Sequence, residues 1–575
     1  MTPHQTLDFD SCYRAASSRD LRFDGRFYTA VTSTGIYCRP ICPARTPARQ
    51  NVRFYRHAAA AEAAGFRPCR RCRPELSPGD PGWDVAADVV GRALRMIDDG
   101  VADEYGVAGL ADRLHVTERH LLRLFTAQLG AGPLAVARTR RLLLAKQLLT
   151  ETPLPITDVA FAAGFGSVRQ FNATMKEAYG FAPSDLRTSA GPLTSSRPLA
   201  SSRTSKGPLP SPRTSTGPLA SPHTSTGPLP SPRTSTGPLA RPGAPADGGL
   251  GQGEPATLTL RLTYRPPYDA ASLLGFLAAR AIPGLEQVSP AGYRRAVPGG
   301  HITLTPAAGH VKLSVTLDDT RNLARIVARC RRLLDLDSDP EAIAGALSAT
   351  ALRPLVERHP GLRVPGAFDG FELAIRAVVG QQVSVAGART LLGRITTRAG
   401  TPATPSATPA TTSGTPATPS GPEGPTPLHA GTPATGGDAR DQEGRDDGAP
   451  WLLFPTAERL AEADLSGLGL TGRRITTIRV LAEKVASGEL HLDSGADPAE
   501  TACHLLDIPG IGPWTTGYIV MRALHDPDAW PGGDLGLRRA MKALDIHEDD
   551  VDRWRPWRAY AALHLWNSET TTPAE

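Results

Sequence analysis

The stretch Leu506–Tyr518 reads LDIPGIGPWTTGY. The order hydrophobic-Pro-Gly510-hydrophobic-Gly512 predicts a tight turn between two helices, because glycine adopts backbone angles that other residues avoid. The backbone amides at the start of the second helix can then point at a DNA phosphate. This hairpin alone indicates only nonspecific DNA binding, because it also occurs in proteins that have no catalytic activity.

A carboxylate follows the hairpin at a fixed distance. Asp534 lies 22 residues after Gly512, within the Gly/Pro-rich stretch WPGGDLGLRR at residues 530–539. A single aspartate in a loop is usually a helix cap, so the interpretation depends on this spacing. The hairpin, loop and carboxylate together resemble the helix-hairpin-helix superfamily of DNA glycosylases. The resemblance implies that Asp534 stabilises a cation-like sugar while the N-glycosidic bond breaks, and that Gly510, Gly512 and Thr515 contact DNA.

One position separates two mechanisms within that superfamily. Members that also cleave the DNA strand carry a lysine nucleophile at the start of the helix after the hairpin, and this sequence has Trp514 there. We therefore expect a monofunctional glycosylase that uses water as its nucleophile. We expect no iron-sulfur cluster, because this half holds only Cys330 and Cys503.

Residues 256–572 resemble AlkA-type glycosylases over almost their whole length. The resemblance rests on stretches such as LGFLAARA at 274–281, GQQVSVA at 380–386 and WRPWRAYAALHLW at 554–566. It implies a base pocket lined by Phe276, Trp514, Tyr518 and Trp566, and DNA contacts from Gln381 and Gln382. An electron-rich aromatic pocket suits a cationic base of the 3-methyladenine type that is flipped out of the duplex. Gln382 is a departure, because AlkA has a leucine wedge at that place.

The first half of the chain contains two short cysteine pairs. Cys38-x3-Cys42 and Cys69-x2-Cys72 have the spacing of a tetrahedral zinc site made of four thiolates. Spacing alone favours a zinc ribbon with a purely structural role. Nine arginines and one acid lie between residues 39 and 73, and such a patch is typical of a surface that binds phosphates. A thiolate beside that surface could attack a methyl carbon.

The stretches TGIYCRPIC at 34–42 and AGFRPCRRC at 64–72 are similar to the amino-terminal domain of the Ada family. The resemblance implies that Cys38 irreversibly accepts a methyl group from a DNA methylphosphotriester, with Cys42, Cys69 and Cys72 as the other zinc ligands. Zinc with four thiolates has a formal charge of −2, and methylation of one sulfur changes it to −1. Affinity for DNA should then rise.

Residues 107–125 and 156–172 each predict a helix, a turn and a helix, and the helix predicted at about 133–150 joins them. Any helical bundle could show this pattern, but the two units resemble the AraC-type DNA-binding domain. The resemblance places recognition helices at about 117–128 and 167–178, with Ser167 as an N-cap. The candidates for base or phosphate contact are Arg119, His120, Arg123, Arg169, Gln170 and Asn172.

We predict a multidomain, mainly α protein. An Ada-like α/β zinc domain (1–78) precedes an all-α AraC-type domain (83–187) and a disordered Pro-rich repeat linker (188–254). Alternating Leu258, Leu260 and Leu262 predict an α+β AlkA-like N-terminal domain (256–345) with an antiparallel sheet. An all-α helix-hairpin-helix domain (346–572) with a disordered insertion (400–450) follows.

The amino-acid composition indicates in which cellular compartment the protein acts. Seven cysteines, four of them clustered, argue against a secreted disulfide framework, and no apolar run is long enough to cross a membrane. We expect a monomeric, nucleoid-associated cytoplasmic protein. Its expected partners are alkylated DNA, promoter DNA and, during activation, RNA polymerase. The alternative is a transcription regulator whose second half only binds DNA, and the Gly510, Gly512 and Asp534 set favours the repair enzyme.

Overall fold

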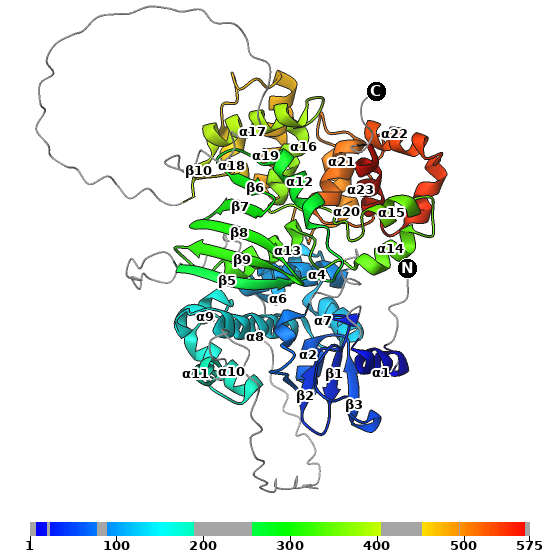
Figure 1. The fold of residues 1–575 in the computed structure, drawn as a ribbon. Helices are drawn as coiled ribbons and strands as arrows, with labels where there is room; N and C mark the ends of the chain where they lie inside the picture. The colour runs from blue at the N-terminus through cyan, green and yellow to red at the C-terminus, as the bar shows by residue number, and fades with distance from the viewer. Residues whose placement is uncertain are drawn as a thin grey trace, which may run out of the picture. The chain divides into compact units, whose positions relative to one another are not determined.

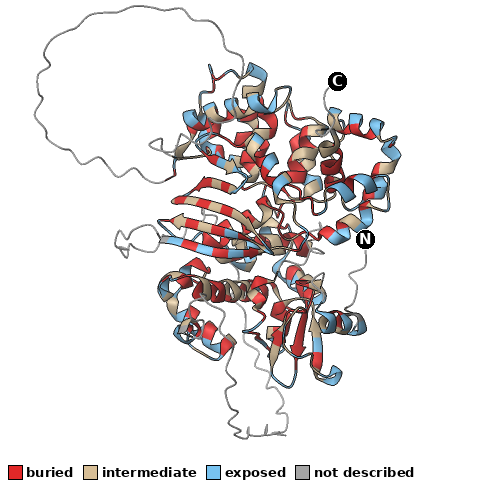
Figure 2. Cartoon of the chain, in the orientation of Figure 1, coloured by how far each residue is buried: buried red, intermediate tan, exposed pale blue. Residues whose placement is uncertain are grey.

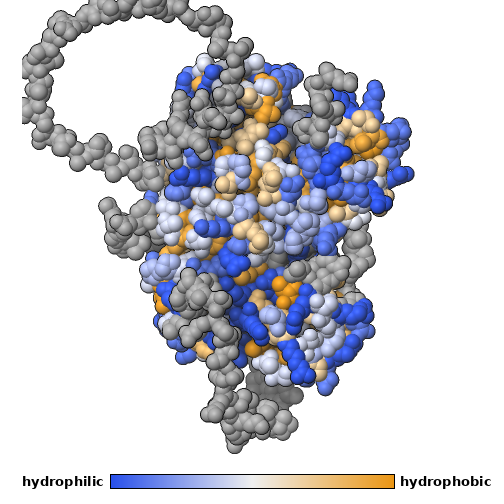
Figure 3. All heavy atoms as spheres, in the orientation of Figure 1, coloured by the Kyte–Doolittle hydropathy of each residue, from blue (hydrophilic) through white to orange (hydrophobic). Residues whose placement is uncertain are grey.

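The computed structural model describes Leu7 and residues 9–19, 23–77, 89–188, 256–403, 451–493 and 495–569 (Figure 1). Nearly all of the expected linker at 188–254 and of the expected insertion at 400–450 lies outside these residues, so both remain predictions. No helix in the described ranges is long and apolar enough to cross a bilayer. On the face that Figure 3 shows, hydrophilic residues surround small, separate groups of hydrophobic ones.

A small sheet brings the two cysteine pairs together. Its strands, in spatial order, are β3 (Val52–Tyr55), β1 (Tyr28–Val31), β2 (Ile36–Cys38) and β4 (Arg67–Pro68). The same region contains α1 (Phe9–Ser18), α2 (Ala58–Ala63) and the 3-10 turns η2 (Arg49–Asn51) and η3 (Pro74–Leu76). Strands β2 and β4 are parallel, with Tyr37 opposite Pro68. Cys38 and Cys69 each follow one of these paired residues, so they emerge side by side.

The next region is entirely helical. Its helices are α4 (Val89–Asp98), α5 (Val101–Glu104), α6 (Gly106–Arg113), α7 (Glu118–Leu129), α8 (Pro133–Glu151), α9 (Ile156–Ala162), α10 (Val168–Tyr179) and α11 (Pro183–Thr188). Helices α7 and α10 lie where the two recognition helices were expected. The side chains of Thr117 and Ser167 cap them, so the predicted N-cap at Ser167 is confirmed. Each helix ends at a glycine with positive φ, Gly130 at 76° and Gly180 at 78°.

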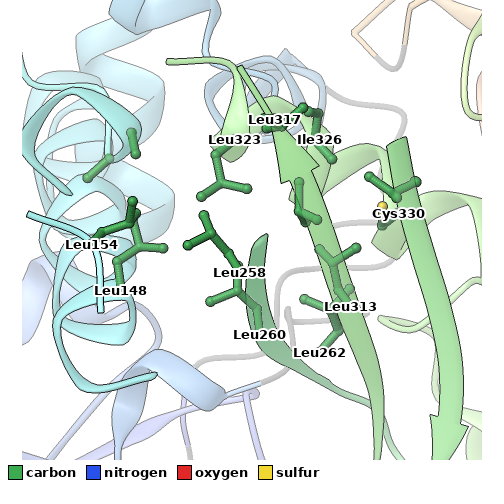
Figure 4. Close-up of a cluster of buried hydrophobic side chains, with 14 of the residues drawn as sticks. Leu148, Leu154, Leu258, Leu260, Leu262, Leu313, Leu317, Leu323, Ile326 and Cys330 are labelled. Carbon is green, nitrogen blue, oxygen red and sulfur yellow. The ribbon is translucent and has the colours of Figure 1, made fainter. Parts of the chain in front are cut away.

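The leucine alternation after residue 256 forms the predicted antiparallel sheet. Its strands, in spatial order, are β5 (Ala256–Thr263), β9 (His310–Leu317), β8 (Gly300–Ala307), β7 (Gly292–Val297) and β6 (Glu286–Ser289). Buried residues alternate along these strands (Figure 2), and Leu260 lies opposite Leu313. Leucines of β5 and β9 face Leu323, Ile326 and Cys330 of α13 (Leu323–Leu333), as Figure 4 shows. Leu273, Leu274 and Leu277 of α12 (Ala270–Arg280) belong to the same buried cluster, so the burial of apolar surface positions this helix.

The rest of the described chain is a bundle of helices. These are α14 (Pro340–Leu347), α15 (Arg353–Arg358), α16 (Gly370–Val379), α17 (Val385–Ala399), α18 (Ala457–Glu462), α19 (Gly472–Ala486), α20 (Pro498–Leu506), α21 (Pro513–Ala523), α22 (Leu535–Ala543) and α23 (Arg558–Glu569), with the 3-10 turn η4 (Glu548–Trp554). The short strands β10 (Thr401–Pro402) and β11 (Leu452–Leu453) pair antiparallel. The chain therefore leaves and re-enters this bundle at one place.

One buried histidine makes the stability of this bundle sensitive to acid. His564 of α23 is only 4% exposed, and its pKa is lowered to about 4 by burial and by repulsion from His359. In the unfolded chain His564 binds a proton near pH 6.5, whereas in the folded protein it binds one only near pH 4. The free energy of unfolding is therefore highest above pH 6.5 and falls as the pH decreases toward 4. The full effect is about 3 kcal/mol.

The variant His564→Gln, which cannot titrate, should lose less stability than wild type between pH 7.5 and pH 4.5. Urea denaturation followed by tryptophan fluorescence measures this difference, because six of the seven tryptophans lie after residue 450. Equal losses in the two proteins would show that His564 does not set the acid sensitivity.

Candidate metal centre and active site

The four clustered cysteines form a site that fits a zinc ion. The sulfur atoms of Cys38, Cys42, Cys69 and Cys72 all lie within 4.8 Å of one another. Four sulfurs at such separations can surround one zinc ion tetrahedrally with Zn–S bonds of about 2.3 Å. The all-sulfur donor set also favours zinc over calcium or magnesium, which prefer oxygen ligands.

The four sulfurs differ in exposure and in their hydrogen bonds. Cys38 and Cys42 are half-buried, whereas Cys69 and Cys72 are buried. Two sulfurs accept backbone N–H groups: Cys69 from Arg71 at 3.4 Å and Cys72 from Arg39 at 3.3 Å. Such hydrogen bonds stabilise the charge on a thiolate and make it a weaker nucleophile. The half-buried Cys38 and Cys42 therefore suit a nucleophile better than the two buried sulfurs, and the choice of Cys38 as methyl acceptor remains a prediction.

The arginines around the cysteines divide into two groups. Six of the nine are exposed and can meet a phosphate backbone: Arg45, Arg49, Arg53, Arg67, Arg70 and Arg71. Arg39 is instead buried, and its Nε donates to Asp24 at 2.9 Å. Its role is to hold the loop that contains Cys72, whose backbone oxygen it also contacts at 3.2 Å. The sequence pattern could not distinguish these two groups.

The predicted contact residues of the two recognition helices lie on accessible faces. Five are exposed, namely Arg119, Arg123, Arg169, Gln170 and Asn172, and His120 is half-buried. A ring nitrogen of His120 lies 2.9 Å from Arg123 Nη2. The side chains of His120 and Arg123 therefore stabilise each other's positions on α7. Their roles toward bases and phosphates remain predictions.

Asp534 is the N-cap of α22 and is held by three hydrogen bonds. Its Oδ1 accepts the backbone N–H of Leu537 and the indole N–H of Trp566, both at 2.9 Å. Its Oδ2 accepts the indole N–H of Trp514 at 2.8 Å. Three separate elements thus orient one carboxylate, which suits a group that must face a developing positive charge without moving.

The aromatic residues expected in the base pocket surround this carboxylate. A cavity of about 740 Å³ is lined by Phe276, Trp514, Tyr518, Trp566 and Asp534, among others. The rings of Trp514 and Tyr518 stack with centroids 5.6 Å apart, and Trp566 meets Tyr518 edge-on at 6.4 Å. The structure therefore brings together residues from α12, α21, α22 and α23, whose numbers span nearly 300 positions.

The hairpin has the tight geometry that its glycines require. Gly510 has φ of +96°, and a Cβ atom there would lie 2.3 Å from Thr477 Oγ1. Gly512 is the N-cap of α21. The hairpin is therefore compatible with glycine alone at position 510.

Two residues that were expected to contact DNA have another role in this structure. Thr515 is only 3% exposed, and its hydroxyl accepts a hydrogen bond from Gln381 Nε2 at 2.9 Å. The same amide group also donates to the backbone oxygen of Gly510. These side chains brace the hairpin, and their contacts with DNA remain predictions. Gln382 is exposed beside them, with φ of +56°.

Two arginines of the cavity were missed in the sequence. Arg280 follows Phe276 by four positions on α12, and Arg522 follows Tyr518 by four positions on α21. Side chains four apart on a helix are neighbours, so this spacing was the signal that could have identified both. Each guanidinium lies over an aromatic ring of the cavity.

Comparisons with known proteins match three separate stretches of the chain. Three family models match: the metal binding domain of Ada at residues 11–75, a helix-turn-helix domain at 110–189 and the AlkA N-terminal domain at 259–369. The "probable bifunctional transcriptional activator/DNA repair enzyme AlkA" of Mycobacterium tuberculosis (strain ATCC 25618 / H37Rv) is 41% identical over 98% of this chain and 96% of its own length.

Two further relatives match parts of the chain. DNA-3-methyladenine glycosylase 2 of Escherichia coli K12 is 31% identical over 55% of this chain and 99% of its own length. The bifunctional transcriptional activator/DNA repair enzyme Ada of the same organism is 40% identical over 24% of this chain and 38% of its own.

Proposed function

Because this chain belongs to the family of fused Ada–AlkA proteins, we propose that it repairs alkylated DNA and regulates transcription in response to the same damage. Its second half is a DNA-3-methyladenine glycosylase, and its first half combines a zinc-binding methyl acceptor with a helix-turn-helix domain. The observation that carries the proposal is Asp534, fixed by two indoles at the wall of an aromatic cavity.

The glycosylase reaction follows from this geometry. An alkylated base turns out of the duplex into the cavity and stacks on the aromatic side chains. As the N-glycosidic bond breaks, its electron pair leaves with the base and the sugar becomes cationic. The carboxylate of Asp534 stabilises that cation, and water then adds to the anomeric carbon and loses a proton. Gln382, exposed next to the hairpin, fills the space left in the duplex.

The nucleophile is water because the cavity offers no suitable amine. Trp514 occupies the second position of α21, and no lysine is among the described residues that line the cavity. The DNA product is therefore an abasic site on an intact strand.

In the first half, Cys38 is the methyl acceptor. Its sulfur forms a bond to the methyl carbon of a phosphotriester, and the broken C–O bond leaves its electron pair on the phosphate oxygen. Cys38, Cys42, Cys69 and Cys72 would hold a zinc ion, which would keep their sulfurs in the thiolate form. Methylation lowers the negative charge of the site, so its repulsion from the DNA backbone falls and the helix-turn-helix domain binds promoter DNA more tightly.

The proposal extends to partners and location. The candidate contacts on α7 and α10 lie on accessible faces, which suits insertion into the major groove of double-stranded DNA. The protein acts as a monomer in the cytoplasm, associated with the nucleoid, and contacts RNA polymerase when it activates a gene.

Incubation of the protein with methylated duplex DNA should release free 3-methyladenine and leave intact abasic strands. Chromatography of the released bases and denaturing electrophoresis of the strands measure both products. Borohydride should trap no covalent complex, because a Schiff base needs an amine nucleophile. Failure to release any base would favour the alternative of a regulator whose second half only binds DNA, and a trapped complex would refute the monofunctional mechanism.

A further inference from the structure

Two positively charged side chains lie inside the base cavity. The guanidinium carbon of Arg280 is 3.7 Å from the centre of the Phe276 ring, and that of Arg522 is 4.8 Å from the same ring. Arg522 also lies 5.3 Å from the ring of Tyr518. The π electrons of these two rings therefore already interact with cations that belong to the protein. These rings would therefore attract a cationic base less strongly.

The carboxylates of the cavity do not neutralise these two arginines. Each acidic side chain of the lining has other partners: Glu286 and Glu372 pair with Arg376, Asp369 pairs with Arg329, and Asp534 accepts the two indoles. Within the described residues, neither Arg280 nor Arg522 forms an ion pair with a carboxylate. The cavity thus has an excess of positive charge where the base must lie.

Arg522 also has hydrogen-bond donors to spare. Its Nε donates to the backbone oxygen of Pro365 at 2.7 Å, Nη1 to the Tyr518 hydroxyl at 2.5 Å and Nη2 to the backbone oxygen of Gly366 at 3.1 Å. A guanidinium has five N–H groups, so two have no partner among the described residues. Arg522 is only 6% exposed, and leaving buried donors unpaired costs free energy.

The positive charges of Arg522 and Arg280 also act on the neighbouring Tyr518. Burial raises the pKa of Tyr518, but the charges of Arg522 and Arg280 outweigh burial and hold that pKa below its ordinary value. The Tyr518 oxygen accepts its hydrogen bond from Arg522, so its own O–H group can donate to a base. Both groups therefore offer donors to an acceptor atom.

We propose that Arg522 and Arg280 are specificity-determining residues, which favour neutral bases with a carbonyl oxygen over cationic N-alkylated bases. This inference rests on the proposed glycosylase activity. A carbonyl oxygen satisfies the free donors, whereas a cationic base meets like charges in a site of low dielectric constant. Cationic lesions are still excised because their glycosidic bond is weak, and neutral lesions gain from the pocket itself.

The test compares two probes, duplexes that contain either hypoxanthine or 7-methylguanine. For each enzyme, the ratio of kcat/KM for hypoxanthine to kcat/KM for 7-methylguanine is measured. The intrinsic strength of each glycosidic bond is the same for every variant, so a change in this ratio reports the pocket alone. Arg522→Met should lower the ratio about tenfold, the scale of one lost charge or hydrogen-bond interaction in a pocket.

Arg280→Gln serves as the second variant, because Arg522→Met leaves two backbone oxygens without their donor and can destabilise the fold. Arg280 is half-buried and its guanidinium donates only to the backbone oxygen of Phe276 among the described residues. The Arg280→Gln variant should also have a lower ratio of hypoxanthine to 7-methylguanine excision than wild type.

Arg294→Gln is the matched control, because Arg294 also lies over a ring, that of Trp451, but outside the cavity. Its ratio should equal that of wild type.

The outcomes distinguish a failure of the proposed function from a failure of the specificity inference. If wild type releases neither base, the proposed function itself fails. If wild type releases both bases but the ratio stays unchanged in both cavity variants, the specificity inference is wrong and the glycosylase remains. An equal loss of kcat/KM on both probes would assign these arginines a structural role and also overturn the inference.

Discussion

Replacing Asp534 by asparagine should reduce base excision by about 10²–10³-fold while the protein still binds duplex DNA. The substitution removes the negative charge that faces the sugar cation and leaves the hairpin at Gly510 and Gly512 unchanged. Single-turnover release of 3-methyladenine measures the chemical step, and a gel-shift titration on the same duplex measures binding. Wild-type rates of excision in the variant would refute the assigned role of Asp534.

The geometry shows which controls this experiment needs. An asparagine amide nitrogen cannot accept the hydrogen bond from Trp514, so the variant loses one hydrogen bond together with the charge. Trp514→Phe removes that hydrogen bond and part of the aromatic wall but keeps the charge, and it should cost about tenfold or less in rate. Asp269→Asn is the matched capping control, because Asp269 caps α12 and is outside the cavity lining. It should excise bases at the wild-type rate.

Incubation with duplex DNA that carries methylphosphotriesters should add one methyl group to Cys38 and to no other cysteine. The structure provides an internal control, because Cys42 is also half-buried in the same cluster. Peptide mass spectrometry distinguishes the two positions. A label on Cys42 would refute the assignment of Cys38 as the nucleophile, and a label on Cys12 would contradict the sensor itself.

Methylation should also strengthen promoter binding, on the order of tenfold at low salt, since the site loses one negative charge near the phosphates. The gain should shrink as salt rises, because ions screen the charge of the site. Titrations of methylated and unmethylated protein at two salt concentrations measure both effects. A gain that does not depend on salt would indicate a conformational switch in place of an electrostatic one.

The features that the sequence alone predicted are local ones. Alternating leucines after residue 256 predicted a strand, and Ser167 before a helical run predicted a cap, because both depend on neighbours within a few positions. The two cysteine pairs are likewise short patterns, and they indicated a metal centre before any fold was known. Resemblance to the Ada and AlkA families supplied the remaining residues, including Asp534 and its aromatic neighbours.

Tertiary structure decided what each of those residues can do. It distinguished the buried Cys69 and Cys72 from the half-buried Cys38 and Cys42, because the backbone N–H groups that reach the two buried sulfurs depend on the loop conformation around them. It brought Gln381 and Thr515 into a hydrogen bond that stabilises the hairpin. It placed Arg280 and Arg522 over one ring, although they lie 242 positions apart in the sequence. Such contacts arise from the packing of separate helices, and no local pattern of residues encodes the charge of a cavity that distant segments build together.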